Sequence, residues 1–171
     1  MRITRRLCSL VLAAIFLLPV VAARSSAARE VVQFDGAAPG TIVVKTGERR
    51  LYYVFSNGQA IRYPVGVGKA GKQWAGESYI DGKHVRPAWS PPPEVRRDKP
   101  SLPEVIAGDS PRNPMGAAAL TLNGGEYAIH GTNAPGSVGR FVSYGCIRMY
   151  NQDIVDLFDR VDVGTPVIVT R

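Results

Sequence analysis

Short runs of β-branched and aromatic residues, separated by turn residues, mark the chain after its first quarter. Residues 41–44 and 51–55 are two such runs, joined by a glycine-containing turn at 47–50. The Asn57-Gly58 pair that follows tolerates the positive φ values of a type I′ turn and leads into a third run over residues 59–67. Three adjacent strands with short turns predict an antiparallel meander.

This pattern dissolves between residues 66 and 114, where glycines and then prolines crowd the chain. Apolar side chains are nevertheless interleaved throughout: Trp74, Tyr79, Ile80, Val85, Trp89, Leu102, Val105 and Ile106. A solvated linker rarely carries so much apolar surface. We therefore expect an ordered, irregular excursion that packs on the sheet and shapes a groove, with His84 as a loop residue.

Strand patterns return in the last third of the chain. Residues 117–122 and 126–129 flank Asn123-Gly124-Gly125, a second hairpin signal, and residues 167–169 form a closing strand. Between them one helix is predicted, with Asn151 as its cap and Asp153 in its first turn. Its apolar face consists of Ile154, Val155, Leu157, Phe158 and Val161. Among the aromatic residues, Tyr52, Phe55 and Phe158 are expected in the core.

Composition and charge place the chain among globular proteins and argue against nucleic-acid binding. The 171 residues are 45% hydrophobic and 20% charged, which suits one domain with its own core. The formal charge is +7, but the first 28 residues hold four of the 21 basic residues and none of the 14 acidic ones. The remaining +3 is scattered, without the basic stripe that a nucleic-acid surface normally shows.

The first 28 residues have the pattern of a secretory signal peptide. A basic start is followed by an apolar stretch over residues 10–21 and then by small residues, with cleavage after Ala23 or near Ala28. An uncleaved anchor is the alternative, but about 12 apolar residues are fewer than the roughly 20 that span a bilayer. We expect an exported protein without a stable membrane anchor, located in the periplasm or cell wall. Residues 29–39 would form a short lead before a domain over residues 40–171.

Export changes the meaning of the two cysteines, because Cys8 would leave with the signal peptide. Cys146 then remains as a lone thiol in an oxidising compartment. It could form an intermolecular disulfide, lie inert in the core, or act as a nucleophile. A metal site with His84 and His130 is disfavoured, because no two of these ligands have the close spacing of zinc sites. No metal or cofactor is expected.

The neighbours of Cys146 favour the nucleophile. His130 ends a predicted strand, and a 15-residue connection leads from it to Cys146 just before the helix. An imidazole and backbone amides at this turn would favour the thiolate, so we expect a thiol pKa below its ordinary value of about 8.5. Amide N–H groups around Gly145 and Cys146 could hold an oxyanion, and Arg148 is a natural partner for a substrate carboxylate.

The segment as a whole resembles the active-site signature of the L,D-transpeptidase family, the cysteine enzymes that cross-link bacterial peptidoglycan. His130-Gly131 matches the first part, and Ser143-Tyr144-Gly145-Cys146-Ile147-Arg148 matches the second. Residues 87–92 and 113–116 also look like the family, and the resemblance covers roughly residues 40–171. It implies a mainly β fold, a compact sandwich or barrel-like sheet with one short helix after the cysteine turn.

The resemblance also implies roles for individual residues. Cys146 would attack the carbonyl of the third residue of a stem peptide and release the terminal D-alanine. His130 would take the thiol proton, and the Gly131 carbonyl would orient its ring. Ser143, Tyr144, Gly145 and Arg148 would hold the oxyanion or the substrate, with Tyr144 standing where many members have histidine.

The acyl acceptor stays open at this stage. The thioester on Cys146 could pass to the amine of a second stem peptide, to an outer-membrane protein, or to water in an L,D-carboxypeptidase. Two alternative hypotheses remain: another kind of exported cysteine enzyme, or a non-catalytic wall-binding module of the same fold. Intact His130, Gly145, Cys146 and Arg148 argue against a module that only binds.

Overall fold

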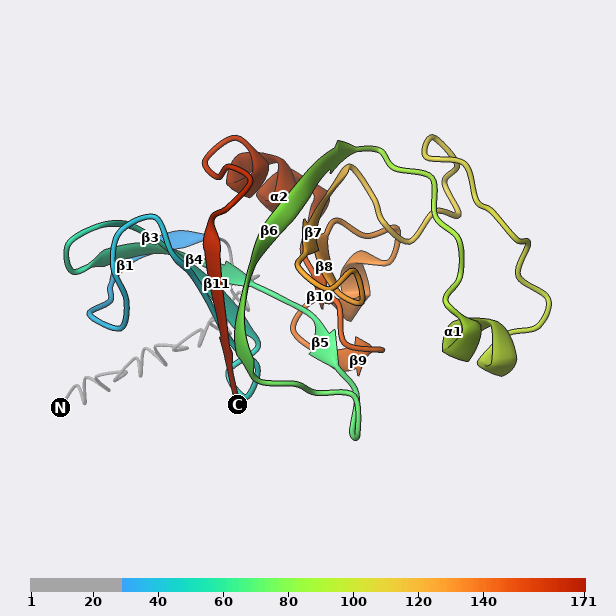
Figure 1. The fold of residues 1–171 in the computed structure, drawn as a ribbon, viewed down its shortest axis with the longest axis horizontal. Coiled ribbons are helices and arrows are strands. Elements are labelled where there is room, and N and C mark those ends of the chain that lie inside the picture. The colour runs from blue at the N-terminus through green and yellow to red at the C-terminus, as the bar shows by residue number, and fades with distance from the viewer. Residues whose placement is uncertain (1–28) are drawn as a thin grey trace, which may run out of the picture.

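A computed structural model describes residues 29–171 and contains one long mixed sheet, one small sheet and two α-helices (Figure 1). The predicted signal peptide lies outside the described residues. The long sheet has the order β1-β4-β3-β2-β11-β6-β7-β8-β10. Its strands are β1 (Glu30–Gln33), β2 (Ile42–Lys45), β3 (Arg50–Ser56), β4 (Gln59–Pro64), β6 (Gly76–Val85), β7 (Ala118–Leu122), β8 (Ala128–His130), β10 (Ile147–Arg148) and β11 (Pro166–Thr170). The remaining elements are β5 (Val67–Gly68), β9 (Phe141–Ser143), α1 (Pro93–Asp98), α2 (Asn151–Phe158) and the 3₁₀ turn Pro135–Ser137.

The predicted meander is confirmed, since β2, β3 and β4 pair antiparallel in sequence order. The third run is shorter than expected: β4 ends at Pro64, and β5 pairs with β9 in the small sheet. Between them the chain bends at Gly66, where an added Cβ would lie 2.6 Å from the Ser137 carbonyl oxygen. Gly66 also exchanges two backbone hydrogen bonds of 2.8 Å with Arg148. This bridge brings the end of the meander against β10 and accounts for the barrel-like character.

The other half of the sheet contains a strand that the sequence did not predict. β6 spans ten residues of the supposed irregular excursion, pairing with β11 on one side and β7 on the other. Its hydrophobic alternation is hidden because Ile80 is its one fully buried residue and its register shifts between Ile80 and Gly82. His84 consequently lies on a strand and not in a loop.

The rest of the excursion, residues 86–114, is ordered as expected. Trp89 and Ile106 form an isolated antiparallel bridge, and the Asn113 amide donates to the carbonyls of Pro87, Ile106 and Ala107. One buried asparagine thus holds together backbone segments about twenty residues apart in sequence. The excursion carries α1, which the sequence also failed to predict, at the far end of the molecule from β1 (Figure 1).

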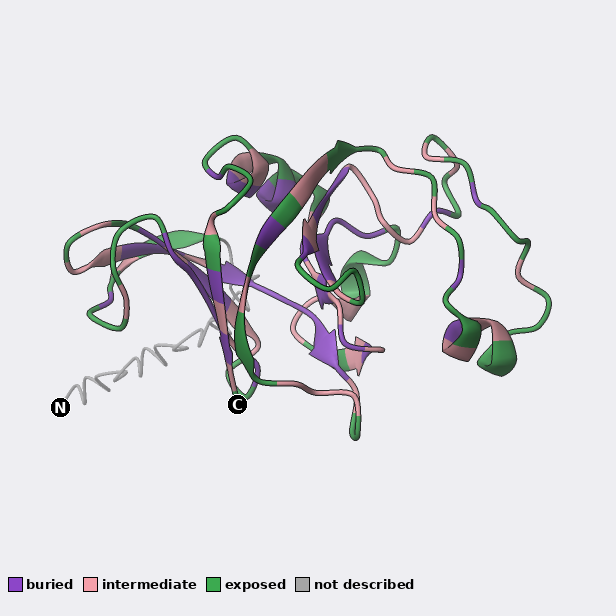
Figure 2. Cartoon of the chain, in the orientation of Figure 1, coloured by how far each residue is buried: buried purple, intermediate pink, exposed green. Residues whose placement is uncertain are grey.

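The main core lies between the long sheet and α2 (Figure 2). Its fully buried members include Ile42, Leu51, Tyr63, Leu120, Ile129, Ile154 and Leu157. A smaller cluster covers the opposite face of the meander, where Phe34 stacks on Tyr52 with ring centroids 4.6 Å apart. Two core predictions are wrong: Phe55 is 41% exposed and Val155 is 44% exposed. Phe55 lies on the exposed side of β3, next to the buried Val54, and Val155 lies on the exposed side of α2, next to the buried Ile154.

α2 begins one residue earlier than a cap at Asn151 would require. Tyr150 is the N-cap residue and makes no side-chain capping bond, so the prediction for Asn151 is wrong. The Asn151 Oδ1 instead accepts hydrogen bonds of 3.0 Å from the Ala117 and Thr132 backbone N–H groups. It therefore ties the start of α2 to the chain before β7 and after β8. No helix among the described residues is long and apolar enough to cross a membrane.

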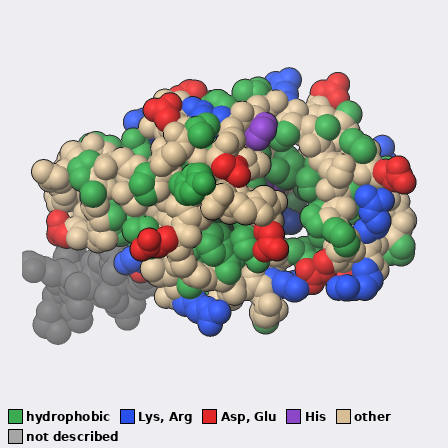
Figure 3. All heavy atoms as spheres, viewed as in Figure 1, with side chains coloured by type: hydrophobic (Ala, Val, Ile, Leu, Met, Phe, Trp, Pro, Cys, Tyr) green, Lys and Arg blue, Asp and Glu red, His purple; other side chains and the backbone are tan. Residues whose placement is uncertain are grey.

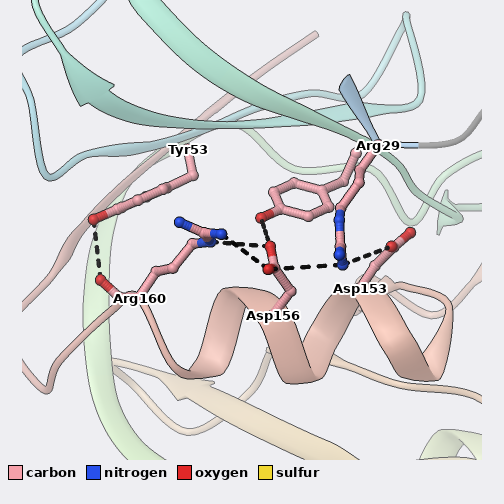
Figure 4. A network of polar contacts seen from close by, with 6 residues as sticks. Arg29, Tyr53, Asp153, Asp156 and Arg160 are labelled. Carbon is pink, nitrogen blue, oxygen red and sulfur yellow. Dashed lines mark hydrogen bonds and ion pairs between the residues drawn. The ribbon is translucent and has the colours of Figure 1, made fainter. Parts of the chain in front are cut away.

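Charged residues on α2 join it to the meander (Figure 4). Asp156 accepts hydrogen bonds from the Arg160 guanidinium and from the buried Tyr63 hydroxyl. Arg29, just before β1, lies 3.8 Å from Asp153 and 3.7 Å from Asp156. Tyr53 closes the network by donating to the Arg160 carbonyl. The helix that follows the cysteine turn is thereby fixed to both β1 and β3–β4.

Candidate active site

Pairing of β8 with β10 brings the predicted histidine and cysteine segments together. The two strands run parallel, with Ile129 opposite Ile147 and His130 opposite Arg148. Both isoleucines are buried in the main core, and side chains alternate between the faces of a sheet. His130 and Arg148 therefore point to the other face, as does Cys146, one residue before Ile147.

These three side chains line one pocket of about 410 Å³. Its opposite wall comes from the excursion and α1, through Trp89, Pro92, Pro93, Glu94 and Val95. Lys72, Pro114, Met115, Tyr127, Ser143 and Tyr144 complete most of the lining. The surface is hollowed between the body of the sheet and the excursion (Figure 3). The groove expected from the excursion is thus present, and it contains the cysteine.

His130 is a buried, neutral imidazole. It is 3% exposed, and its Nδ1 lies 2.7 Å from the Gly131 carbonyl oxygen, which can only accept a hydrogen bond. That contact places the proton on Nδ1 and leaves Nε2 as the basic nitrogen. Burial is the main cause that lowers the pKa of His130 to about 4. The nearby Arg148 charge acts in the same direction, and the Gly131 and Pro114 carbonyls act against both.

The Cys146 thiol departs from expectation in the direction of its pKa shift. Burial raises its pKa above the ordinary value, while the Ala128 backbone and the Arg148 charge oppose this shift less strongly. Across residues 29–171, no hydrogen bond joins the thiol to the His130 ring. The pair can perform acyl transfer if the imidazole takes the proton as the sulfur attacks, instead of before it.

The Ser143 side chain holds the turn that leads to Cys146. The Ser143 hydroxyl donates to the Cys146 carbonyl at 2.6 Å and accepts from the Gly145 N–H at 3.1 Å. Ser143 lines the pocket, but its hydroxyl is engaged in the turn. Gly145 has φ +127°, and an added Cβ would lie 2.2 Å from the Tyr127 ring. Glycine is therefore required at this position for both backbone and packing reasons.

Tyr144 connects the cysteine turn to α1. Its hydroxyl donates to Asp98 Oδ2 at 2.6 Å, and this hydrogen bond, with help from Lys69, lowers the Asp98 pKa. The Lys69 ammonium also lies 3.8 Å from the centroid of the Tyr144 ring. A second link joins Lys72 to Glu94 at 2.5 Å. Sequence reasoning missed Lys69, Lys72, Glu94 and Asp98, because their partners are distant in the chain.

Arg148 is a largely buried cation at the pocket. Burial lowers its pKa from the ordinary arginine value, and its Nε has no hydrogen-bond partner within the described residues. A partly buried guanidinium with a free Nε–H can pair with a carboxylate through charge-assisted hydrogen bonds. This position suits the substrate-binding role that the sequence implied.

No group of three or more histidine, cysteine or acidic residues in the described chain could hold a metal ion. Cys146 is a free thiol. The candidate site therefore consists of the thiol, the imidazole with its Gly131 contact, the guanidinium and the turn.

Residues 39–169 match the family described as YkuD, L,D-transpeptidase catalytic domain. Among curated proteins, the chain is 42% identical over 135 residues to the probable L,D-transpeptidase ErfK/SrfK of Escherichia coli, an alignment covering 74% of this chain and 42% of that protein. It thus spans less than half the length of that relative.

Solved structures agree on the fold. An L,D-transpeptidase from Mycobacterium smegmatis aligns with TM-score 0.58 and 20% identity, covering 77% of this chain and 58% of that one. A structure from Brucella melitensis aligns with TM-score 0.56 and 38% identity, covering 84% of this chain and 93% of that one. The latter carries the name of a probable carnitine operon oxidoreductase, whereas the family match and the curated relative are named for transpeptidation.

Proposed function

The chain belongs to the L,D-transpeptidase catalytic domain family, and we propose from this premise that it transfers acyl groups between peptidoglycan stem peptides. One observation carries the proposal: Cys146, His130 and Arg148 share one face of β8–β10 and line a single pocket. A thiol, a neutral imidazole and a cation are the groups that cysteine-based acyl transfer at a carboxylate-bearing peptide needs.

In the first step, Cys146 Sγ attacks the carbonyl carbon of the third residue of a tetrapeptide donor. His130 Nε2 takes the thiol proton as the S–C bond forms, because a neutral base and a neutral thiol are more favourable here than an ion pair. The tetrahedral intermediate then collapses, the C–N bond to D-alanine breaks, and the imidazolium returns the proton to the leaving amine. A thioester on Cys146 remains.

In the second step, the thioester passes to an acceptor. An amine of a second stem peptide attacks, His130 removes its proton, and the same proton reprotonates the departing thiol. The product is a cross-link in the cell wall. The same chemistry with water gives an L,D-carboxypeptidase, and with an amine of an outer-membrane protein it attaches that protein to the wall.

Other groups bind and orient the donor. Arg148 pairs with a carboxylate of the stem peptide, and Gly131 keeps the His130 ring in its working tautomer. Tyr144 lines the pocket beside α1, where its hydroxyl is already bound to Asp98. Its proposed contribution is therefore to substrate binding and not to proton transfer.

Export completes the proposal. Cleavage of residues 1–28 would release residues 29–171 to the periplasm or cell wall, where peptidoglycan is found.

The test is D-alanine release from a tetrapeptide donor by the exported protein and three variants. Cys146→Ala should lose all turnover, and His130→Ala should lose at least about 10²–10⁴-fold, the range for a general base. Tyr144→Phe should keep kcat and change KM at most. Folding is confirmed for each variant by circular dichroism.

Two results would contradict the assignment. A His130→Ala variant with near-native turnover, paired with an inactive Tyr144→Phe, would mean that the roles are wrong. Wild-type protein that binds wall fragments but releases no D-alanine would favour the non-catalytic module. The identity of the acceptor follows from mass spectrometry of wall fragments incubated with the protein.

A further inference from the structure

Side chains hold the peptide units on either side of Gly145 and Cys146. The Gly145 N–H donates to Ser143 Oγ, and the Cys146 carbonyl accepts from the same hydroxyl. The unit between them, which joins Gly145 to Cys146, is held by Trp74, whose indole Nε1–H donates to the Gly145 carbonyl at 3.0 Å. Trp74 lies in the loop between β5 and β6, 71 residues from its partner.

This arrangement identifies which backbone donor remains for an oxyanion. The Gly145 N–H is engaged with Ser143, although the sequence made it a candidate. Across the described part of the chain, no hydrogen bond uses the Cys146 N–H. In a trans peptide the C=O and N–H groups point in opposite directions. Because the Gly145 carbonyl points to Trp74, the Cys146 N–H points away from it.

The same peptide unit has a particular need for an external partner. Gly145 cannot be replaced by a residue with a side chain, because the Tyr127 ring occupies the Cβ position. Glycine has wide conformational freedom, so the peptide unit that follows it can rotate at little cost. Without a hydrogen bond to its carbonyl, the Gly145–Cys146 unit would sample orientations in which the Cys146 N–H misses the pocket.

Trp74 is itself rigidly placed. Its ring stacks on Tyr127 with centroids 4.9 Å apart and planes 8° apart, and both rings pack against the main core. Trp74 is not among the residues that line the pocket, whereas Tyr127 is. The indole therefore acts from behind the turn, on the side away from the substrate.

We propose that Trp74 is a positioning residue for the oxyanion site, acting through the Gly145–Cys146 peptide. Its hydrogen bond fixes the direction of the Cys146 N–H and polarises the amide, which makes that N–H a stronger donor to the oxyanion. This inference rests on the proposed function, because it concerns the tetrahedral intermediate of acyl transfer. No contact between Trp74 and substrate is involved.

The test compares two reactions of the same thiol. Acylation by p-nitrophenyl acetate passes through an oxyanion: the sulfur adds to the carbonyl, and nitrophenolate leaves. Alkylation by iodoacetamide forms an S–C bond and expels iodide without any oxyanion. Trp74→Phe keeps an aromatic ring but removes the N–H, so acylation should slow by about 10-fold, less than the loss of a whole oxyanion donor. Alkylation should stay within about 2-fold, because no oxyanion forms.

A second replacement guards against misfolding of Trp74→Phe. Benzothienylalanine at position 74 keeps the shape and stacking of tryptophan with sulfur in place of the N–H, and it should reproduce the selective loss of acylation. With the tetrapeptide donor, both variants should lower kcat with KM unchanged. The control is Tyr53→Phe, which removes a single side-chain hydrogen bond to a distant carbonyl, that of Arg160. It should change neither reaction.

The outcomes separate the inference from the proposed function. A position-74 variant that keeps the wild-type ratio of acylation to alkylation overturns the role of Trp74, as does one that slows both reactions equally. Wild-type protein that is alkylated at Cys146 but acylated by neither the ester nor the donor peptide overturns the proposed function, and the inference with it.

Discussion

At the residue scale, Arg148 acts on both groups expected to do the chemistry. It lies opposite His130 on the neighbouring strand and two residues after Cys146. Its charge lowers the pKa of both, but burial also acts on both and dominates. The imidazole loses its proton easily, and the thiol keeps its own. Of these three groups the guanidinium is thus the charged one, and it stays available for a carboxylate.

These directions predict how reactivity depends on pH. A thiol with a raised pKa holds its proton at neutral pH, so alkylation by iodoacetamide should still be rising above pH 9. An imidazole with its pKa lowered to about 4 stays neutral and basic above that value. D-alanine release should therefore be constant from about pH 5.5 to 7.5 and fall only as His130 becomes protonated.

Arg148→Gln provides the control for this profile. Removal of the positive charge should move the acid limb to higher pH, whatever it does to donor binding, because a cation beside an imidazole lowers its pKa. An alkylation profile that levels off below pH 8 would contradict the neutral pair and restore the thiolate expected from the sequence.

The sequence was sufficient to select three residues that line one pocket, but not the directions of their pKa shifts. A short stretch of sequence contains Cys146, His130 and Arg148, so its motif was enough to identify them as candidates. The thiol pKa depends on burial, and part of the pocket wall, including Trp89 and Val95, comes from a segment some fifty residues earlier in the chain. Trp74 gave no signal of its role, because an indole that bonds a distant carbonyl looks like any core aromatic.

At the element scale, α2 carries two aspartates one turn apart in opposite environments. Asp156 is bound by Arg160 and Tyr63, and the Arg160 hydrogen bond is the main cause of its lowered pKa. Asp153 is buried, and burial raises its pKa despite the half-exposed Arg29 at 3.8 Å. The helix thus contains one stabilising carboxylate and one that is costly to ionise.

Matched amide substitutions should separate these two carboxylates. Asp156→Asn should lower the free energy of unfolding at pH 7 by about 1–3 kcal/mol, because it weakens hydrogen bonds to a charged group. Asp153→Asn should leave it unchanged or raise it, because a neutral amide avoids the burial of a charge. Urea denaturation measures both.

The two variants should also differ in how their stability depends on pH. The lowered pKa of Asp156 gives stability that is present above the unfolded value and is lost as pH falls through the folded one, so the deficit of Asp156→Asn should shrink below about pH 4. The raised pKa of Asp153 costs stability above its unfolded value, so any gain from Asp153→Asn should vanish in acid. Equal losses from both variants at pH 7 would refute the distinction.

Elements with local signals were predictable, and those defined by distant contacts were not. Asn57-Gly58 and Asn123-Gly124-Gly125 marked two hairpins through their turn residues. The expected type I′ turn at the first is wrong, because Gly58 has a positive φ and Asn57 does not. β6 lacked hydrophobic alternation because Ile80 is its one buried residue, while Tyr79 and Val85 are exposed. Its pairing partners on β7 lie far along the chain. α1 has six residues and one buried side chain, Val95, which is too little for a helical period.

At the scale of the whole molecule, the last strand joins the two halves of the long sheet. β11 pairs parallel with β2 and antiparallel with β6, and its Val167 and Val169 are buried in the main core. β1, in contrast, forms one edge and pairs with β4 alone. A mainly β fold followed from the strand runs and the family resemblance, but the place of each strand in the sheet depended on pairings between the chain ends.

Deletion of each chain end should therefore have different consequences. Without residues 166–171, β2 and β6 lose their common neighbour and the core is open between the halves, so no cooperative unfolding transition should remain.

Without residues 29–39, β4 becomes an edge strand and Tyr52 loses the stacked Phe34 ring, which is 8% exposed. That chain should fold with a lower Tm, having lost the burial of one phenylalanine, worth about 1.5–3 kcal/mol. Its Cys146 should react with iodoacetamide at the wild-type rate, because none of residues 29–39 lines the pocket. Thermal denaturation and alkylation measure both effects. An unfolded chain after the N-terminal deletion would place the start of the domain at β1 and not at residue 40.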